Sequence, residues 1–242
     1  MLSIVIPAFN EETVIGETVA DVQKHFHPDE LIVVSDGSTD RTDEIAASRG
    51  ARVLRLPANR GKGAAVRQGV LEARGDVIAF IDADMPYRPA NLERAIDLVR
   101  TNAADLAIGA RDLPQSESDP SYPTRRKFAG RTLSLLIRLF LMRDITDTQC
   151  GLKAFRGDVA KHLFSASRID GFGFDFEVLF LAQRRGLRIA RVPVNLSHRH
   201  ASRVRLVRDS LLMLRDLVRV RVSAALGDYD SPQRGRRGRR ER

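Results

Sequence analysis

The fold of this chain is decided by the stretch Val77-Ile78-Ala79-Phe80-Ile81-Asp82-Ala83-Asp84. Its first five residues have the length and apolar character of a buried strand, and two carboxylates one residue apart follow them. Because neighbouring carboxylates repel each other, the pair favours a cation between them. Carboxylates, water and substrate phosphates are the ligands that Mg²⁺ or Mn²⁺ prefers. One interpretation is therefore a divalent metal held on a nucleotide diphosphate, and the other is a solvated Asp-x-Asp loop.

Apolar, strand-like runs alternate with helical segments over the first half of the chain. This alternation predicts an α/β fold with a mainly parallel sheet covered by helices on both faces. In such sheets the ligand site lies beyond the carboxyl ends of the strands. We therefore expect a site built from the polar residues that follow the apolar runs, which are Asn10, Asp36, Asp82, Asp84 and Arg111. The strands are predicted at 2–6 (ended by Pro7), 30–34, 52–56, 76–81 and 105–109, and the helices at 13–25, from 41, at 64–73 and at 89–101.

The pattern changes after Arg111. Residues 112–124 are rich in Pro, Ser and acidic side chains, which is typical of a loop. We expect one domain over residues 1–227 and a disordered, Arg-rich tail over 228–242, because the tail has no core pattern. The further elements are predicted as a helix at 128–142, a turn and short strand at 147–155, a helix after 158, a helix at 174–185, a strand at 187–194 and a helix at 203–222.

The composition narrows the classes of function. A net charge of +9, carried mostly by arginine, attracts polyanions such as nucleic acid, an anionic membrane or phosphorylated substrates. Nucleic acid is not expected, since no aromatic platform or nucleic-acid motif accompanies the basic tail. A single cysteine excludes an internal disulfide and a cysteine-based zinc site, and the five histidines show no metal-ligand spacing. We expect neither a signal peptide nor a transmembrane helix, because neither apolar pattern is present.

Several features remain open to two interpretations. Gly61-Lys62-Gly63 matches neither the phosphate-loop nor the dinucleotide-binding pattern, so it is either an anion-binding helix start or an ordinary tight connection. Asp175 and Glu177 open a predicted helix; one could be a general base, but stabilisation of the helix N-terminus is preferred. Cys150 is interpreted as a buried structural thiol rather than a nucleophile.

The predicted C-terminal helix is amphipathic. An apolar stripe with basic neighbours either packs on the sheet, which is slightly preferred, or lies on anionic lipid as an interfacial helix. The stripe consists of Val207, Leu211, Leu214 and Val218, and the basic neighbours are Arg208, Arg215 and Arg219.

Taken in order, the motifs resemble those of family 2 glycosyltransferases with the GT-A fold. The resemblance covers about residues 2–222. The landmarks in the first half are Ile4–Glu12 (IVIPAFNEE), Val33–Asp40 (VVSDGSTD), Asn59–Gly63 (NRGKG) and Asp82-Ala83-Asp84. Four motifs in the second half are similar to those of polyprenyl-phosphate sugar synthases, most of all to those of dolichyl-phosphate glucosyltransferases. They are Gly109-Ala110-Arg111, Asp147–Lys153 (DTQCGLK), Phe174–Glu177 (FDFE) and Ser202-Arg203-Val204.

The resemblance implies an inverting, metal-dependent hexosyltransferase. It would move glucose or mannose from UDP-glucose or GDP-mannose to a polyprenyl or dolichyl monophosphate, with Mg²⁺ or Mn²⁺ as cofactor. The expected location is peripheral, on the anionic cytoplasmic face of a membrane. Two alternatives stay open: the same fold acting on a soluble or cell-wall acceptor, and a non-catalytic, basic membrane-binding scaffold. The sugar, the base and the oligomeric state are left undetermined.

The resemblance also implies roles for matching positions. Asp84, with Asp82, would hold the metal, and Asp84, Asp175 and Arg131 would be the catalytic residues. Arg131, Arg199 and Arg203 would bind the acceptor phosphate. The nucleotide sugar would be bound by Pro7, Ala8, Asn10, Glu11, Asp36, Lys62, Asp82, Ala83 and Arg111.

Three positions depart from the family pattern. Ser35 stands where an Asp often precedes the Asp-Gly-Ser turn. Pro86 replaces a Gln two residues after the metal Asp, so water and phosphate would complete the coordination. Arg203 replaces the usual Lys, which keeps the charge and changes the geometry.

Overall fold

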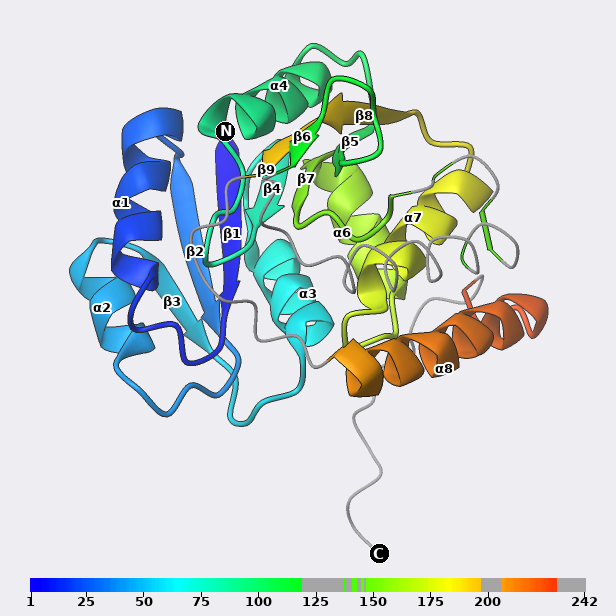
Figure 1. Cartoon of the computed structure of the whole chain (residues 1–242), viewed down its shortest axis with the longest axis horizontal. Helices are drawn as coiled ribbons and strands as arrows, with labels where there is room; N and C mark the ends of the chain where they lie inside the picture. Colours follow the sequence, from blue (N-terminus) through cyan, green and yellow to red (C-terminus); the bar gives the residue numbers. More distant parts are fainter. Residues whose placement is uncertain (119–136, 138–140, 143–144, 146, 197–205, 230–242) are drawn as a thin grey trace, which may run out of the picture.

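The structure is a computed structural model that describes residues 1–118, 137, 141–142, 145, 147–196 and 206–229. Three predicted site residues, Arg131, Arg199 and Arg203, lie outside this range, as does most of the helix predicted at 128–142. Figure 1 shows a central twisted sheet with helices on both of its faces. The predicted α/β architecture is therefore confirmed.

Seven strands form the main sheet in the order β3-β2-β1-β4-β7-β5-β8. All pairings are parallel except those of β7, which runs antiparallel to both β4 and β5. Two short strands, β6 and β9, form a second small sheet that the sequence did not predict. The strands are β1 Leu2–Ala8, β2 Glu30–Ser35, β3 Arg52–Arg55, β4 Val77–Ile81, β5 Leu106–Ala110, β6 Glu117–Ser118, β7 Leu152–Arg156, β8 Ile189–Pro193 and β9 Asn195–Leu196.

Two apolar layers pack on opposite faces of the sheet. Alternate strand residues point to opposite sides, so Ile4 and Ile6 belong to one layer while Val5 belongs to the other. Helices α1, α2 and α4 cover the first face, and α3, α6, α7 and α8 build the second layer. The helices are α1 Ile15–Phe26, α2 Thr42–Ser48, α3 Lys62–Glu72, α4 Pro89–Arg100, α6 Gly157–Ala166, α7 Phe174–Arg184 and α8 Leu206–Ala225.

The first strand is longer than predicted. It was expected to end at Pro7, but β1 continues through Pro7 to Ala8. The recorded pairing of β1 with β4 stops at Val5, whereas its pairing with β2 continues to Ala8. Proline is tolerated in a strand where its nitrogen does not need to donate a hydrogen bond to a neighbouring strand. Pro7 lies in the part of β1 that is paired with β2 but not with β4.

The packing of α8 also differs from the preferred interpretation. Leu211, Leu214 and Val218 were expected to pack on the core, but they are 63%, 40% and 58% exposed. The helix packs instead through a second stripe that includes Met213 and Leu217. Both stripes have helical spacing, so the pattern alone could not decide which one faces the protein.

Ordered packing extends beyond the predicted domain boundary at residue 227. The Tyr229 side chain is buried, and its hydroxyl donates a 2.7 Å hydrogen bond to Glu177 Oε1. The carbonyl oxygen of Asp228 accepts a 2.6 Å hydrogen bond from Arg168. Asp228 and Tyr229 are therefore part of the folded domain, and the rest of the predicted tail lies outside the described residues.

None of the helices in the described part of the chain combines the length and apolar character needed to cross a bilayer.

The Tyr229 contact predicts a measurable effect on stability. Tyr229→Phe removes the hydroxyl and leaves the buried Glu177 carboxylate with one donor fewer, so unfolding should become easier by about 1–2 kcal/mol. Ser165→Ala removes an exposed hydroxyl that donates to a backbone carbonyl, and it should change stability little. Denaturant unfolding measures both variants; equal stabilities for Tyr229→Phe and the parent would contradict the role given to Tyr229.

Candidate active site

The two carboxylates of the opening stretch lie on a tight turn at the end of β4. The Met85 backbone N–H donates a 3.0 Å hydrogen bond to the carbonyl oxygen of Asp82, and Met85 has a positive φ of 35°. Ala83, between the two carboxylates, accepts a 2.5 Å hydrogen bond from the Thr18 hydroxyl through its carbonyl oxygen. Asp82 and Asp84 are both half-buried. The backbone of this turn is thus fixed, and it holds both carboxylates at the carboxyl edge of the sheet.

Lys62, the first residue of α3, is the positive partner of this pair. Its Nζ lies 2.5 Å from Asp82 Oδ1. The Lys62 ammonium group is therefore the direct charge partner of this carboxylate oxygen. Burial alone would lower the pKa of Lys62, but the negative charges of Asp82, Asp175 and Asp84 outweigh it and raise the pKa. Lys62 is therefore a charged group that is paired with Asp82 and stabilised by the charges of Asp175 and Asp84.

Asp175 lies in the interior, on the first turn of α7. Both Asp175 and Lys153 are almost completely buried, and Lys153 Nζ lies 2.5 Å from Asp175 Oδ1. The same ammonium group donates a 2.7 Å hydrogen bond to the carbonyl oxygen of Cys150. Burial raises the pKa of Asp175, and the positive charges of Lys153 and Lys62 oppose this effect. Removal of either member would leave the other as an uncompensated buried charge, which is strongly destabilising.

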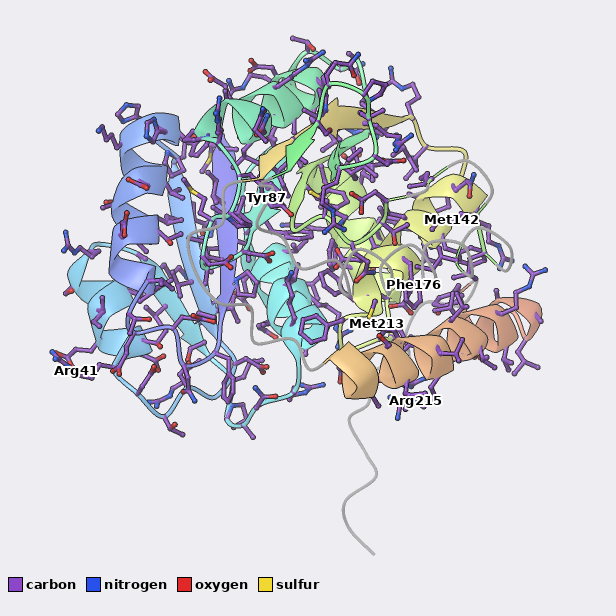
Figure 2. All side chains as sticks on the ribbon, in the orientation of Figure 1. Arg41, Tyr87, Met142, Phe176, Met213 and Arg215 are labelled. Carbon is purple, nitrogen blue, oxygen red and sulfur yellow. The ribbon has the colours of Figure 1, made fainter. Side chains whose placement is uncertain are left out.

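The start of β7 reaches the same edge because β7 runs antiparallel to β4. Gly151, the residue before β7, packs directly against Asp82: a Cβ atom at this position would lie 1.9 Å from Asp82 Oδ2. The Gly151 N–H donates a 3.2 Å hydrogen bond to the hydroxyl of Tyr87, a buried residue that lies close to β4 (Figure 2). Only glycine fits at position 151, because any side chain there would overlap the Asp82 carboxylate.

Arg111, which follows β5, is held by Asp147. Arg111 Nε and Nη2 donate hydrogen bonds of 2.8 Å and 2.7 Å to the two carboxylate oxygens of Asp147, and the Arg111 backbone N–H donates a third. Burial would raise the pKa of Asp147, but the hydrogen bonds and charge of Arg111 outweigh it and lower the pKa. Burial raises the pKa of the nearby Cys150 thiol to about 11, so this thiol is protonated at neutral pH. The preferred interpretation of Cys150 as a structural thiol agrees with its burial.

Four of the predicted nucleotide-binding residues lie at the end of β1 and on the loop after it. Pro7 and Ala8 complete the strand, and the Glu11 carbonyl oxygen accepts backbone hydrogen bonds from the start of α1. Asn10 Oδ1 accepts a 2.8 Å hydrogen bond from the Thr39 backbone N–H. This contact ties the loop after β1 to the turn after β2.

Asp36 shapes the loop that leads into Lys62. Its two carboxylate oxygens each accept a 2.8 Å hydrogen bond, one from the Arg60 backbone N–H and one from that of Gly61. At the start of α3, the Ala64 N–H donates to the carbonyl oxygen of Asp170 at 3.1 Å. This packing favours the tight-connection interpretation of the glycine-lysine-glycine motif over an open anion-binding helix start. The predicted contact of Asp36 with a nucleotide base stays a prediction.

The carboxylate turn has the donor set of a magnesium or manganese site. No three His, Cys, Asp or Glu side chains gather into a metal-ligand cluster within the residues that the structure describes. Mg²⁺ is commonly bound by one or two carboxylates, with substrate phosphates and water as the remaining ligands. Asp84 and Asp82 fit that arrangement, because both are half-buried carboxylates on one tight turn at the carboxyl edge of the sheet. The predicted metal ligands are therefore compatible with the structure.

The structure brings Lys62, Asp82, Asp84 and Asp175 together and places Arg111 at the same edge of the sheet. Sequence reasoning gave no role to Lys153, Asp147, Tyr87 or Gly151. One signal for Lys153 was present: a lysine inside an apolar strand requires a buried partner. For Asp147, Tyr87 and Gly151 the pairings depend on three-dimensional packing.

Comparison with known proteins agrees with this geometry. A family model described as glycosyl transferase family 2 matches residues 3–164. The chain belongs to this family. The chain is 32% identical to the dolichyl-phosphate beta-glucosyltransferase of Saccharomyces cerevisiae, over 94% of this chain and 76% of the relative. It is 34% identical to the enzyme of the same name from Drosophila melanogaster, with the same coverage of both chains.

Solved structures give the same fold. The structure matches glucosyl-3-phosphoglycerate synthase from Mycobacterium tuberculosis in complex with UDP, with a TM-score of 0.70 and 25% identity over 97% of this chain and 82% of that one. A complex of the same enzyme with Mn²⁺, UDP and glucosyl-3-phosphoglycerate matches with a TM-score of 0.66 and 25% identity, again over 97% and 82%. The GT-A fold predicted from the sequence is thus confirmed.

The packing of Gly151 predicts how a substitution there acts. Gly151→Ala places a methyl group within the Asp82 carboxylate, so this carboxylate must shift from its position beside Lys62. We expect lower thermal stability and at least about tenfold weaker binding of the nucleotide sugar, which corresponds to about 1.4 kcal/mol.

A double-mutant cycle with Asp82→Ala separates this effect from general damage. If Gly151→Ala acts through Asp82, it should add little to the effect of Asp82→Ala, because the side chain it displaces is already gone. Fully additive losses of stability and binding would contradict the proposed contact.

Proposed function

We propose that this protein transfers glucose from a uridine diphosphate sugar to the phosphate of a polyprenyl lipid, with inversion at the anomeric carbon. The observation that carries the proposal is the similarity to dolichyl-phosphate beta-glucosyltransferases over more than 90% of the chain. That similarity extends well beyond the family model, which ends at residue 164. It therefore includes Asp175 and α8. The choice of UDP-glucose as the donor is supported by the sugar in the relatives' names and by the UDP in a solved structure of the same fold.

A divalent metal would be held by Asp84, with Asp82 beside it, and when bound it would neutralise charge on the departing diphosphate. Lys62 and Arg111 would add positive charge at the same edge of the sheet. Such fixed charges stabilise a leaving group without rearranging during the reaction. The chain's own contribution is thus a preset electrostatic environment for the diphosphate.

The acceptor phosphate is already an anion and needs little deprotonation. Its oxygen would form the new bond to the anomeric carbon as the bond from that carbon to the diphosphate oxygen breaks, which inverts the configuration. Asp175 is paired with Lys153 at 2.5 Å, an arrangement that suits a positioning role better than that of a strong general base. Catalysis would then rest mainly on the alignment of the two substrates.

A second candidate is transfer to a soluble, phosphorylated acceptor. It is favoured by the match to glucosyl-3-phosphoglycerate synthase, whose structure this chain shares over 97% of its length. Both candidates use the same donor site and an anionic acceptor, so the acceptor alone distinguishes them.

A direct assay decides between the two acceptors. Purified protein is incubated with UDP-glucose and Mn²⁺, together with either a short-chain polyprenyl phosphate or 3-phosphoglycerate, and the glucosylated products are measured. The proposal predicts the lipid product. Product from 3-phosphoglycerate alone would support the second candidate and overturn the first.

The carboxylate turn is tested by Asp84→Asn, which keeps the size of the side chain and removes its charge. We expect loss of transfer by about 100-fold or more, since stabilisation of the leaving group by a metal is worth several kcal/mol. The manganese-dependent part of UDP binding, measured by calorimetry, should disappear as well. Asp97→Asn, an exposed position on α4, is the matched control and should retain both. Manganese-dependent binding that survives in Asp84→Asn would rule out the metal assignment.

A further inference from the structure

The outward side of α8 is an apolar face that no described part of the chain covers. A helix on the surface of a globular protein usually turns polar residues to solvent. On α8 the large apolar side chains on the outward side are instead exposed by 37% to 72%, including the residue just after the helix. They are Leu211, Leu212, Leu214, Val218, Val222 and Leu226. We refer to them as the outer α8 face.

The outer α8 face is distinct from the side that holds the helix in place. Met213, Leu217 and Val220 are buried in the same apolar layer as α7. Figure 2 shows Met213 on the side of α8 that faces Phe176 and Arg215 on the side away from it. The helix is therefore fixed to the domain by one stripe, while a second apolar stripe is exposed among the residues that the structure describes.

Within residues 210–226, the exposed charges beside the outer α8 face are all positive. Arg215, Arg219 and Arg221 are exposed along the helix. Between residues 210 and 226 the sequence has one carboxylate, Asp216, and it is 3% exposed. Apolar side chains flanked by arginine, with no exposed carboxylate, are complementary to anionic phospholipid headgroups above an acyl layer.

A groove beside the outer α8 face has the same chemistry. It lies between the C-terminal parts of α7 and α8 and has a volume of about 510 Å³. Phe180 contributes to its lining, together with two guanidinium groups, those of Arg184 and Arg221. Arginine binds phosphate oxygens through paired donors, so the groove is suited to a phospholipid headgroup.

The inner side of α8 connects this surface to the candidate active site. Asp216 packs against the Gly171–Gly173 loop so closely that a Cβ on Gly173 would lie 2.8 Å from Asp216 Cβ. Asp175 follows this loop directly at the start of α7. A surface that binds the outside of α8 is thus separated from the Asp175 end of the site only by the helix and this loop.

We propose that the outer α8 face docks the protein on an anionic phospholipid bilayer. The proposal deepens the proposed function, on which it rests, by naming the surface that brings the domain to a lipid acceptor. The apolar side chains enter the interface between headgroups and acyl chains, and the arginines contact the headgroups. The alternative occupant, a second copy of this chain, is an outcome of the test below.

The test is co-sedimentation of the full chain with phosphatidylcholine vesicles that contain or lack phosphatidylglycerol. The full chain should bind the anionic vesicles more tightly, and added salt should weaken that binding. The double variant Leu211→Glu/Val218→Glu should reduce binding by about tenfold or more. Arg219→Glu/Arg221→Glu should remove most of the preference for anionic vesicles. The matched controls are Leu71→Glu on α3 and Arg94→Glu on α4, which are also exposed and should bind as the parent does.

Vesicle binding by Leu211→Glu/Val218→Glu that equals that of the parent would overturn the proposal. If the parent is a dimer, and this variant becomes monomeric while its vesicle binding is unchanged, the face is a subunit interface and the proposal is also overturned. Binding of UDP-glucose without lipid should be unaffected by all four variants. Vesicle binding without glucosyl transfer to polyprenyl phosphate would contradict the proposed function but support the docking surface. Glucosyl transfer without vesicle binding would support the proposed function but contradict the docking surface.

Discussion

The Lys62 ammonium group lies 2.5 Å from Asp82 and carries a charge that Asp84 and Asp175 also stabilise. Asp175 is in turn paired with the buried Lys153. Each of these charges would be costly in a half-buried or buried position without its neighbour. The alternation of positive and negative groups is therefore the constraint on which the site depends, since it joins α3, β4, β7 and α7 at one point.

The sheet topology explains how residues far apart in the sequence meet there. The parallel strands β1, β2, β4 and β5 all end at one edge, and the antiparallel β7 begins at that same edge. Gly151, just before β7, can then lie against Asp82, and Lys153 inside β7 can reach Asp175. The same packing continues outward through the Gly171–Gly173 loop to α8. A surface helix with an exposed apolar face is thus built onto the loop that precedes Asp175.

The sequence was sufficient for the architecture, because a period-two or period-3.6 apolar pattern reports directly which face of an element is buried. It was also sufficient to predict that Asp82 and Asp84 lie at the end of a strand, since both follow a continuous apolar run of strand length. It could not show that Gly151 packs on Asp82 or that Asp147 binds Arg111, because those pairs are separated by dozens of residues. The sequence also could not show which of the two apolar stripes on α8 packs on the domain, and the preferred interpretation, in which Leu211, Leu214 and Val218 do so, was wrong. The predicted roles of Arg131, Arg199 and Arg203 stay predictions, since these residues lie outside the described part of the chain.

The central claim is that the turn after β4 positions a cation on the diphosphate of the donor. The most direct measurement is anomalous diffraction at the manganese edge from crystals soaked with Mn²⁺ and UDP-glucose. We expect an anomalous peak between the Asp84 carboxylate and the diphosphate, with Lys62 and Asp82 beside it. A diphosphate bound at this edge of the sheet with no peak at Asp84, or a peak located away from the end of β4, would contradict the metal assignment.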